Sequence, residues 1–178
     1  MSKLTPQDNF LDLSDYGRFP ARLFANLLKH TRVTPIHVTL LFGVSGLVAI
    51  YCILKQYFIV AACFIILKSI IDAADGELAR LNQKPSYTGR YLDSIFDIVL
   101  NFLFLFTIAY VSKESFIITF FAFICMQLQG TLYNYYYVIL RNKSVDGDTT
   151  SKIFEYKTPT ALVGESQKSV NVLFFMYV

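Results

Sequence analysis

The amino-acid sequence predicts an all-α, polytopic integral membrane helical bundle, and three observations lead to that fold class. Hydrophobic residues make up 54% of the 178 residues and charged residues only 16%, whereas soluble domains usually carry about 25% charged residues. The apolar residues are gathered into runs of about 20 residues, which is the length of a helix that crosses a bilayer. Lys and Arg residues are concentrated in alternate connecting segments. This composition is not that of a soluble enzyme, and a net charge of only +3 gives no reason to expect a nucleic-acid partner.

The N-terminal segment, residues 9–33, predicts an amphipathic helix that lies on the membrane surface. Apolar residues recur in it at helical spacing, and basic residues surround them. The apolar residues are Phe19, Leu23, Leu27 and Leu28, and the basic ones are Arg18, Arg22, Lys29 and Arg32. Helices of this kind bind the surface of anionic membranes. The first ten residues contain no apolar core of the kind that a cleaved signal peptide has.

Four apolar segments predict four complete membrane spans. They are residues 36–54, 57–82, 89–111 and 116–140. As a helix the first would be about 28 Å long at about 1.5 Å per residue, close to the thickness of the hydrocarbon core, and Pro35 fits its first turn. Residues 141–168 are polar and predict a loop, and residues 170–178 predict the start of a fifth span. We expect a single membrane-embedded domain over residues 1–178 that is truncated at its C-terminus.

The Lys and Arg residues predict the orientation of the spans. With the N-terminus in the cytoplasm, thirteen of these residues fall on the inside, whereas Lys55 and Lys113 fall outside and Lys68 lies within a span. Cytoplasmic connections carry such an excess of positive charge. The connection between the second and third spans is therefore expected to face the cytoplasm. The three cysteines lie inside apolar runs without ligand spacing, which argues against a disulfide framework and a zinc site.

Four aspartates flank that connection and predict a metal site. Asp72 and Asp75 are three residues apart on one helix, and Asp93 and Asp97 are four apart on the next, so each pair shares a helix face. The short turn between the helices makes them antiparallel neighbours, which lets the four carboxylates converge. Two hard divalent cations, Mg²⁺, Mn²⁺ or Ca²⁺, would neutralise them. Paired metals held by carboxylates are a recurring device of phosphoryl transfer.

The residues between the aspartates favour a phosphate ligand beside the metals. Gly76 and Ala79 leave the helix surface shallow, and Arg80 has the planar fork that clamps a phosphate. Gly89 lies at the start of the next helix, where free backbone N–H groups attract anions. The segment therefore predicts two metals, a diphosphate and a floor of small residues.

The same residues resemble the signature of the CDP-alcohol phosphatidyltransferase family. All eight fixed positions agree, without a gap in their spacing: Asp72, Asp75, Gly76, Ala79, Arg80, Gly89, Asp93 and Asp97. The resemblance implies a membrane enzyme of six transmembrane helices, usually a homodimer, with its active site facing the cytoplasm. Such enzymes are transferases of phospholipid biosynthesis that need Mg²⁺ or Mn²⁺ as cofactor. They join a CDP-linked lipid or alcohol to an acceptor hydroxyl and release CMP.

Carried over by position, the resemblance implies a role for each residue of the signature. The four aspartates would bind the metals, and Asp97 would also be the catalytic base that takes the proton of the acceptor. The CDP moiety would be held by Gly76, Ala79, Arg80 and Gly89. Many family members have Thr-Pro-Asn before the first span, whereas this chain has Ile36 in the Asn position. A nucleotide contact from that position is therefore not expected, and Thr34 or Thr39 could supply one instead.

The acceptor and the donor stay open at this point. Arg90, Arg141 and Lys143 are candidate contacts for an acceptor phosphate, although positive charge on the cytoplasmic side explains them equally well. Lys68 lies one turn before Asp72 and is expected to form an ion pair with it or to reach for the interface. The donor is expected to be CDP-diacylglycerol or a similar lipid. The alternatives are a CDP-choline or CDP-ethanolamine type of transfer to diacylglycerol and, in another class, a divalent-cation transporter.

Overall fold

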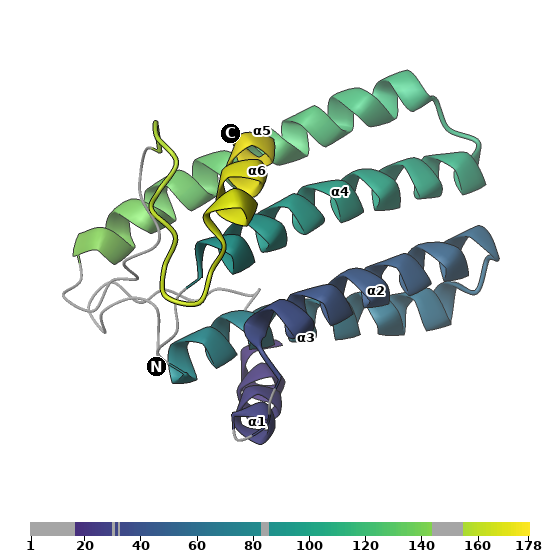
Figure 1. Ribbon diagram of the computed structural model, residues 1–178. Helices are drawn as coiled ribbons and strands as arrows, with labels where there is room; N and C mark the ends of the chain where they lie inside the picture. Colours follow the sequence, from purple (N-terminus) through teal and green to yellow (C-terminus); the bar gives the residue numbers. More distant parts are fainter. Residues whose placement is uncertain (1–16, 30, 32, 83–85, 144–154) are drawn as a thin grey trace.

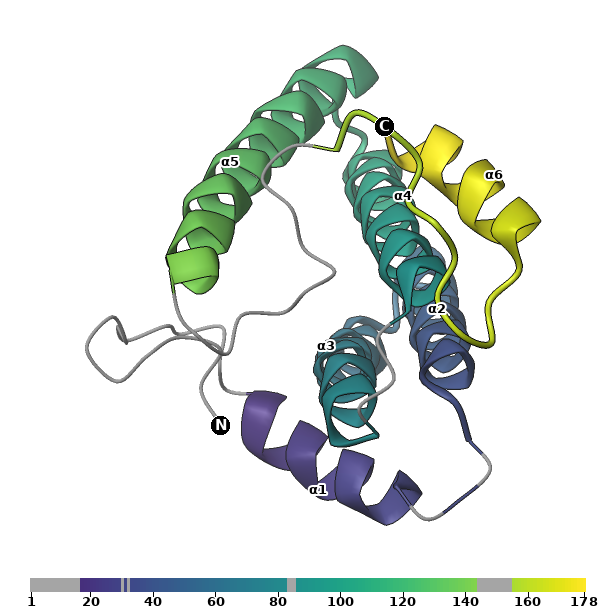
Figure 2. The ribbon, with the colours of Figure 1, turned by 60° about the vertical axis from the view of Figure 1, so that its left-hand side comes forward.

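The protein is an all-α bundle of long helices, as the sequence predicts. The computed structural model describes residues 17–29, 31, 33–82, 86–143 and 155–178, and over these residues it contains six α-helices and no strand. The helices are α1 (Arg18–Leu28), α2 (Pro35–Leu54), α3 (Phe58–Leu81), α4 (Tyr87–Ser112), α5 (Phe116–Lys143) and α6 (Gln167–Tyr177). Helices α2, α3 and α4 run alongside one another, α5 packs on α4 and diverges from it, α1 crosses near one end of α3, and α6 lies against α4 (Figures 1 and 2).

Each of the four segments predicted as spans forms one continuous helix, and three of the described helices are long and apolar enough to be spans. Helices α2 and α4 and residues Phe116–Leu140 of α5 are long and apolar enough to cross a membrane. Helix α3 continues unbroken through its acidic last turns, as expected for residues 57–82. The predicted start of a fifth span is also helical, since α6 begins at Gln167. Helix α5 packs chiefly against α4 and exposes most of its apolar side chains.

The first span starts where the sequence indicates, and His37 takes part in the start. Thr34 is extended and Pro35 occupies the first turn of α2. The backbone N–H of Thr34 donates to Nδ1 of His37 at 3.1 Å, and the Thr34 hydroxyl lies 2.8 Å from the same nitrogen. This reciprocal cap satisfies polar groups at the helix terminus. His37 therefore has a structural partner three residues before it, at the start of the same helix.

Small residues let α2 approach α4 closely. A Cβ added at Gly43 would lie 2.8 Å from Cε2 of Phe96, and one added at Gly46 would lie 2.7 Å from Cδ1 of Leu100. Both contacts are shorter than carbon atoms tolerate. Helix α2 thus contacts both α3 and α4. This arrangement fixes the distance between the two helices that carry the aspartates.

Helix α1 packs against α3 through its small residues. Ala21 and Ala25 are completely buried, whereas Phe19, Leu23 and Leu27 are exposed and form an apolar stripe. The amphipathic helix predicted within residues 9–33 is confirmed over Arg18–Leu28, and residues 9–16 lie outside the described part. The exposed stripe suits contact with a membrane surface, which stays a prediction.

Candidate metal and nucleotide site

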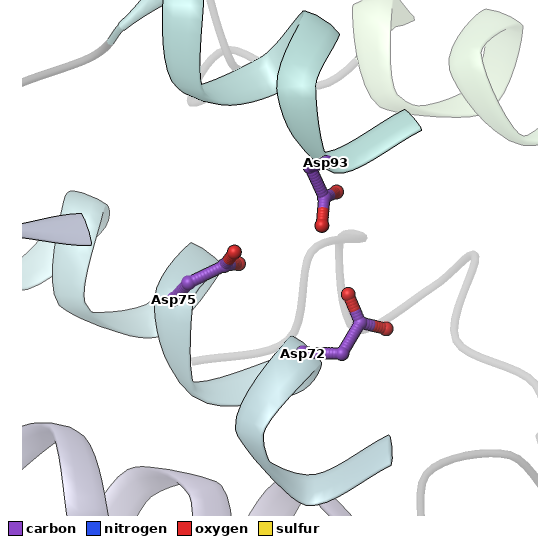
Figure 3. Close-up of side chains that lie close together, drawn as sticks. All are labelled: Asp72, Asp75 and Asp93. Carbon is purple, nitrogen blue, oxygen red and sulfur yellow. The ribbon is translucent and has the colours of Figure 1, made fainter. Parts of the chain in front are cut away.

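Three of the four aspartates converge between α3 and α4. One carboxylate oxygen each of Asp72, Asp75 and Asp93 lies within 4.8 Å of the others. Asp72 and Asp75 point from successive positions on one face of α3, and Asp93 points toward them from α4 (Figure 3). Asp75 is 8% exposed, and the other two are half-buried. Carboxylates this close repel one another, and a bound cation relieves the repulsion.

The group fits a hard divalent cation in a second respect. Oδ1 of Asp93 is buried and makes no hydrogen bond among the described residues. A buried oxygen without a partner is costly, and a metal ion would satisfy it. The three donors are carboxylate oxygens, the ligand type that Mg²⁺, Mn²⁺ and Ca²⁺ prefer. The predicted contribution of Asp72, Asp75 and Asp93 to one site is therefore compatible with the geometry.

Asp97 lies one turn further along α4 and has a different environment. It is not part of the group within 4.8 Å. Its Oδ1 accepts a hydrogen bond from Nζ of Lys68 at 2.8 Å, and the ammonium also lies 4.7 Å from the centre of the Phe42 ring. Lys68 thus bridges α3 to α4 through Asp97, a partner that spacing along the sequence did not indicate. The contact holds one oxygen of Asp97 against α3, outside the group of three aspartates.

Thr39 of α2 contacts the group directly. Its hydroxyl donates to Oδ2 of Asp75 at 2.8 Å, and both residues are buried. The sequence pointed to Thr34 and Thr39 as nucleotide contacts in place of the missing Asn. In the structure Thr34 caps α2 together with His37, whereas Thr39 faces the carboxylate.

The start of α4, where an anion site was predicted, holds a carboxylate of the chain itself. Glu165 accepts hydrogen bonds from the backbone N–H of Thr88 at 2.7 Å and of Tyr87 at 3.2 Å, and from the Ser86 hydroxyl at 2.7 Å. The Gly89 N–H donates to Oγ of Ser86 at 2.8 Å. Because Ser86 caps the helix, α4 begins at Tyr87, two residues earlier than predicted.

These contacts shift the pKa of Glu165. Burial by itself raises the pKa of this carboxyl, but the hydrogen bonds from Ser86, Thr88 and Leu162 outweigh burial and lower the pKa below its ordinary value. Hydrogen bonds to the charged form have this effect because they stabilise it. Glu165 therefore acts as a fixed negative charge at the N-terminus of α4, where the helix dipole favours one.

A second glutamate holds the next residues of α4. Glu155 forms an ion pair with Arg90 and accepts a hydrogen bond from the hydroxyl of Tyr91 at 2.8 Å. The Arg90 guanidinium also stacks on Tyr91 and Tyr177, with 4.7 Å and 5.9 Å to the ring centres. Arg90, a candidate acceptor contact, is thus engaged within the chain. Sequence reasoning missed both glutamates, because each lies more than 60 positions away from its partners at the start of α4.

The structure describes the surroundings of some of the remaining predicted site residues and not of others. Gly76 and Ala79 lie half-buried on α3, close to the aspartates in sequence. The side chains of Arg80, Arg141 and Lys143 lie outside the described part of the structure. Glu77, within the same segment of α3, is buried. Its carboxylate accepts a hydrogen bond at 3.1 Å from Nε of Arg22, which lies on α1. This ion pair anchors the N-terminal helix to the acidic segment.

Comparisons with known proteins find a family whose match spans the aspartates. A model of the CDP-alcohol phosphatidyltransferase family matches residues 32–175, a range that includes all four aspartates. The chain is also similar to the bifunctional IPC transferase and DIPP synthase of Archaeoglobus fulgidus, with 32% identity over 117 residues. That similarity covers 65% of this chain and 23% of the relative. The chain therefore aligns with less than a quarter of the length of this curated relative.

Proposed function

Because the chain belongs to the CDP-alcohol phosphatidyltransferase family, we propose that it transfers a phosphatidyl or similar substituted phosphoryl group from a CDP-linked lipid to the hydroxyl of a small polar alcohol. CMP is the second product, and the reaction is a step of phospholipid synthesis. The observation that carries the proposal is the convergence of Asp72, Asp75 and Asp93 within 4.8 Å. Such a set of oxygen donors suits an ion that binds a diphosphate.

The aspartates would hold the cofactor. Asp72, Asp75 and Asp93, joined by Asp97, would bind two Mg²⁺ or Mn²⁺ ions. When bound, the ions would neutralise the diphosphate and the charge that develops on the departing CMP. The unpartnered Oδ1 of Asp93 supports this assignment.

Residues of the chain would accept the proton of the acceptor and bind the CDP-linked donor. The acceptor oxygen forms a bond to the phosphorus distal to cytidine, the bond between that phosphorus and the bridging oxygen breaks, and CMP leaves with the electron pair. Asp97 would take the hydroxyl proton on the oxygen that Lys68 does not hold. Gly76, Ala79 and Arg80 would receive the CDP moiety along α3.

Of the three basic residues that are candidate contacts of the acceptor, one is already paired within the chain. Arg90 is held by Glu155, so an acceptor phosphate would compete with that carboxylate for the guanidinium. Arg141 and Lys143, at the end of α5, stay proposed acceptor contacts, and Gly89 stays a proposed CDP contact through its position at the start of α4. The three apolar helices and the family indicate a membrane protein. We further propose that its site faces the cytoplasm, as the distribution of Lys and Arg favours, and that the protein is a homodimer.

A transfer assay with purified full-length chain tests the proposal. Labelled CDP-diacylglycerol is incubated with Mn²⁺ or Mg²⁺ and a panel of acceptors: inositol phosphate, glycerol phosphate, inositol, glycerol and serine. CMP release with at least one acceptor is expected, and Asp93→Asn should reduce it by at least about 100-fold, since a lost metal ligand removes charge stabilisation. Glu114→Gln is the matched control, because Glu114 is exposed at the opposite end of α4.

Two further arms separate the alternatives. CDP-choline or CDP-ethanolamine with diacylglycerol replaces the lipid donor, and CMP release in this arm alone would identify the reverse pairing of substrates. Mn²⁺ uptake is followed in proteoliposomes. Uptake that persists in Asp97→Asn, with no CMP release in any mixture, would reject the transferase and favour a transporter.

A further inference from the structure

Thr39 is the neutral side chain that reaches the aspartate group from a third helix. It lies on α2, 36 positions before Asp75, and its Oγ1 donates to Oδ2 of Asp75 at 2.8 Å. Thr39 is 1% exposed, so water does not compete for the hydroxyl. The carbonyl oxygen of Pro35 lies 3.1 Å from the same Oγ1. A hydroxyl has a single proton, and the shorter distance and the charge of the acceptor favour the carboxylate.

Thr39 lies in a buried stretch of α2. Its neighbour Val38 is buried, and Phe42, one turn further along α2, is completely buried. A β-branched side chain in a helix has few rotamers available. The rotation of the Asp75 carboxylate about its last torsion is otherwise broad. A rigid donor on one oxygen therefore fixes that rotation and directs the other oxygen.

We propose that Thr39 is a positioning residue, which orients the carboxylate of Asp75 for a divalent cation. The inference rests on the proposed function, in which Asp75 is a metal ligand. In this role Thr39 acts through its hydrogen bond to Asp75 and needs no contact of its own with metal or substrate. Groups that hydrogen-bond a ligating side chain raise the affinity for the metal, because they hold that side chain in its binding orientation before the metal binds. A contact that only joined α2 to α3 would support the fold and leave the metal affinity unchanged.

Mn²⁺ binding measured by electron paramagnetic resonance separates the two roles without an activity assay. Full-length protein in detergent is titrated with Mn²⁺, and Kd is obtained from the signal of the free ion. Thr39→Val keeps the shape and removes the donor, and we expect it to raise Kd by about 10-fold or more. Thr39→Ser keeps the donor and should restore Kd to within about twofold of the wild type. Thr39→Ala, which also lacks the hydroxyl, replaces the valine variant if that variant does not fold.

Thr119→Val is the matched control. Thr119 of α5 is also buried, and its hydroxyl donates to the carbonyl oxygen of Ser115 at 2.9 Å, so the variant loses a comparable bond far from the aspartates in sequence. Its Kd for Mn²⁺ should match the wild type. An unchanged Kd in a folded, hydroxyl-free Thr39 variant would overturn the inference, and so would a serine variant as weak as valine. If the wild type itself binds no Mn²⁺, the proposed metal-dependent function fails as well.

Discussion

Replacing Gly43 of α2 with Ala is expected to displace the Phe96 ring and, with it, the acidic turn of α4. An added Cβ would lie 2.8 Å from Cε2 and 3.0 Å from Cδ2 of that ring. Because carbon atoms pack at about 3.5–4.0 Å, the ring must retreat by about 1 Å. Phe96 stands between Asp93 and Asp97 in the sequence, so the displacement reaches both carboxylates.

The expected change in the free energy of unfolding of Gly43→Ala combines two opposing contributions. Forcing an extra carbon into a packed contact costs about 1–3 kcal/mol. Ala in place of Gly within a helix stabilises the folded protein by about 1 kcal/mol, because Ala has the higher helix propensity. The net loss of stability is therefore about 1 kcal/mol, with an upper limit of about 2 kcal/mol. Gly130 of α5 offers the matched control, because a Cβ there meets nothing within 4 Å and only the favourable helix term applies.

Two measurements check this prediction. Thermal unfolding in detergent should show a lower Tm for Gly43→Ala and an equal or higher Tm for Gly130→Ala. Mn²⁺ titration should show a higher Kd for Gly43→Ala alone. The double variant Gly43→Ala/Phe96→Leu, in which a smaller side chain replaces the ring, should recover part of both losses. If Gly43→Ala matches the wild type in Tm and in Kd, the close approach of α2 to α4 does not position the aspartates.

Three further predictions concern the contacts that hold the bundle ends. Hydrogen bonds lower the pKa of Glu165 in the folded protein below its ordinary value of 4.5. The ionised Glu165 therefore stabilises the folded protein above about pH 4.5, and this stabilisation is lost as the pH falls through the pKa of the folded state. The Tm advantage of the wild type over Glu165→Gln should therefore shrink on acidification below about pH 4.5, and an advantage that does not change with pH would contradict this reasoning. A double-mutant cycle with Arg22→Gln and Glu77→Gln should give a coupling energy of about 0.5–1 kcal/mol in unfolding, whereas additive effects would mean that the ion pair does not fasten α1 to α3. Tyr91→Phe removes the hydroxyl that donates to Glu155 and should cost about 1 kcal/mol of unfolding free energy; a Tm equal to that of the wild type would show that Arg90 alone satisfies the carboxylate.

The helices and the acidic segment could be predicted because both depend on local information. The uninterrupted apolar run of α2 and the proline in its first turn lie within adjacent turns of chain. Likewise, the three-residue spacing of Asp72 and Asp75 places both on one face of any helix. The connection from α3 to α4 is short in sequence, so Asp93 is expected at the same end of the bundle. Backbone geometry and burial of apolar surface are enough for these inferences.

The sequence by itself therefore determined the helices, their approximate ends, the family and the approach of carboxylates from α3 and α4, whereas it did not separate Asp97 from the three that meet. Only the tertiary structure decided which partners these charged groups take: Thr39 for Asp75, Lys68 for Asp97, and Glu165 for the start of α4. The physical reason is that these partners lie between 29 and 77 positions apart. No helical or turn periodicity relates residues at such separations, and they meet only because α2, α3, α4 and the segment before α6 pack side by side.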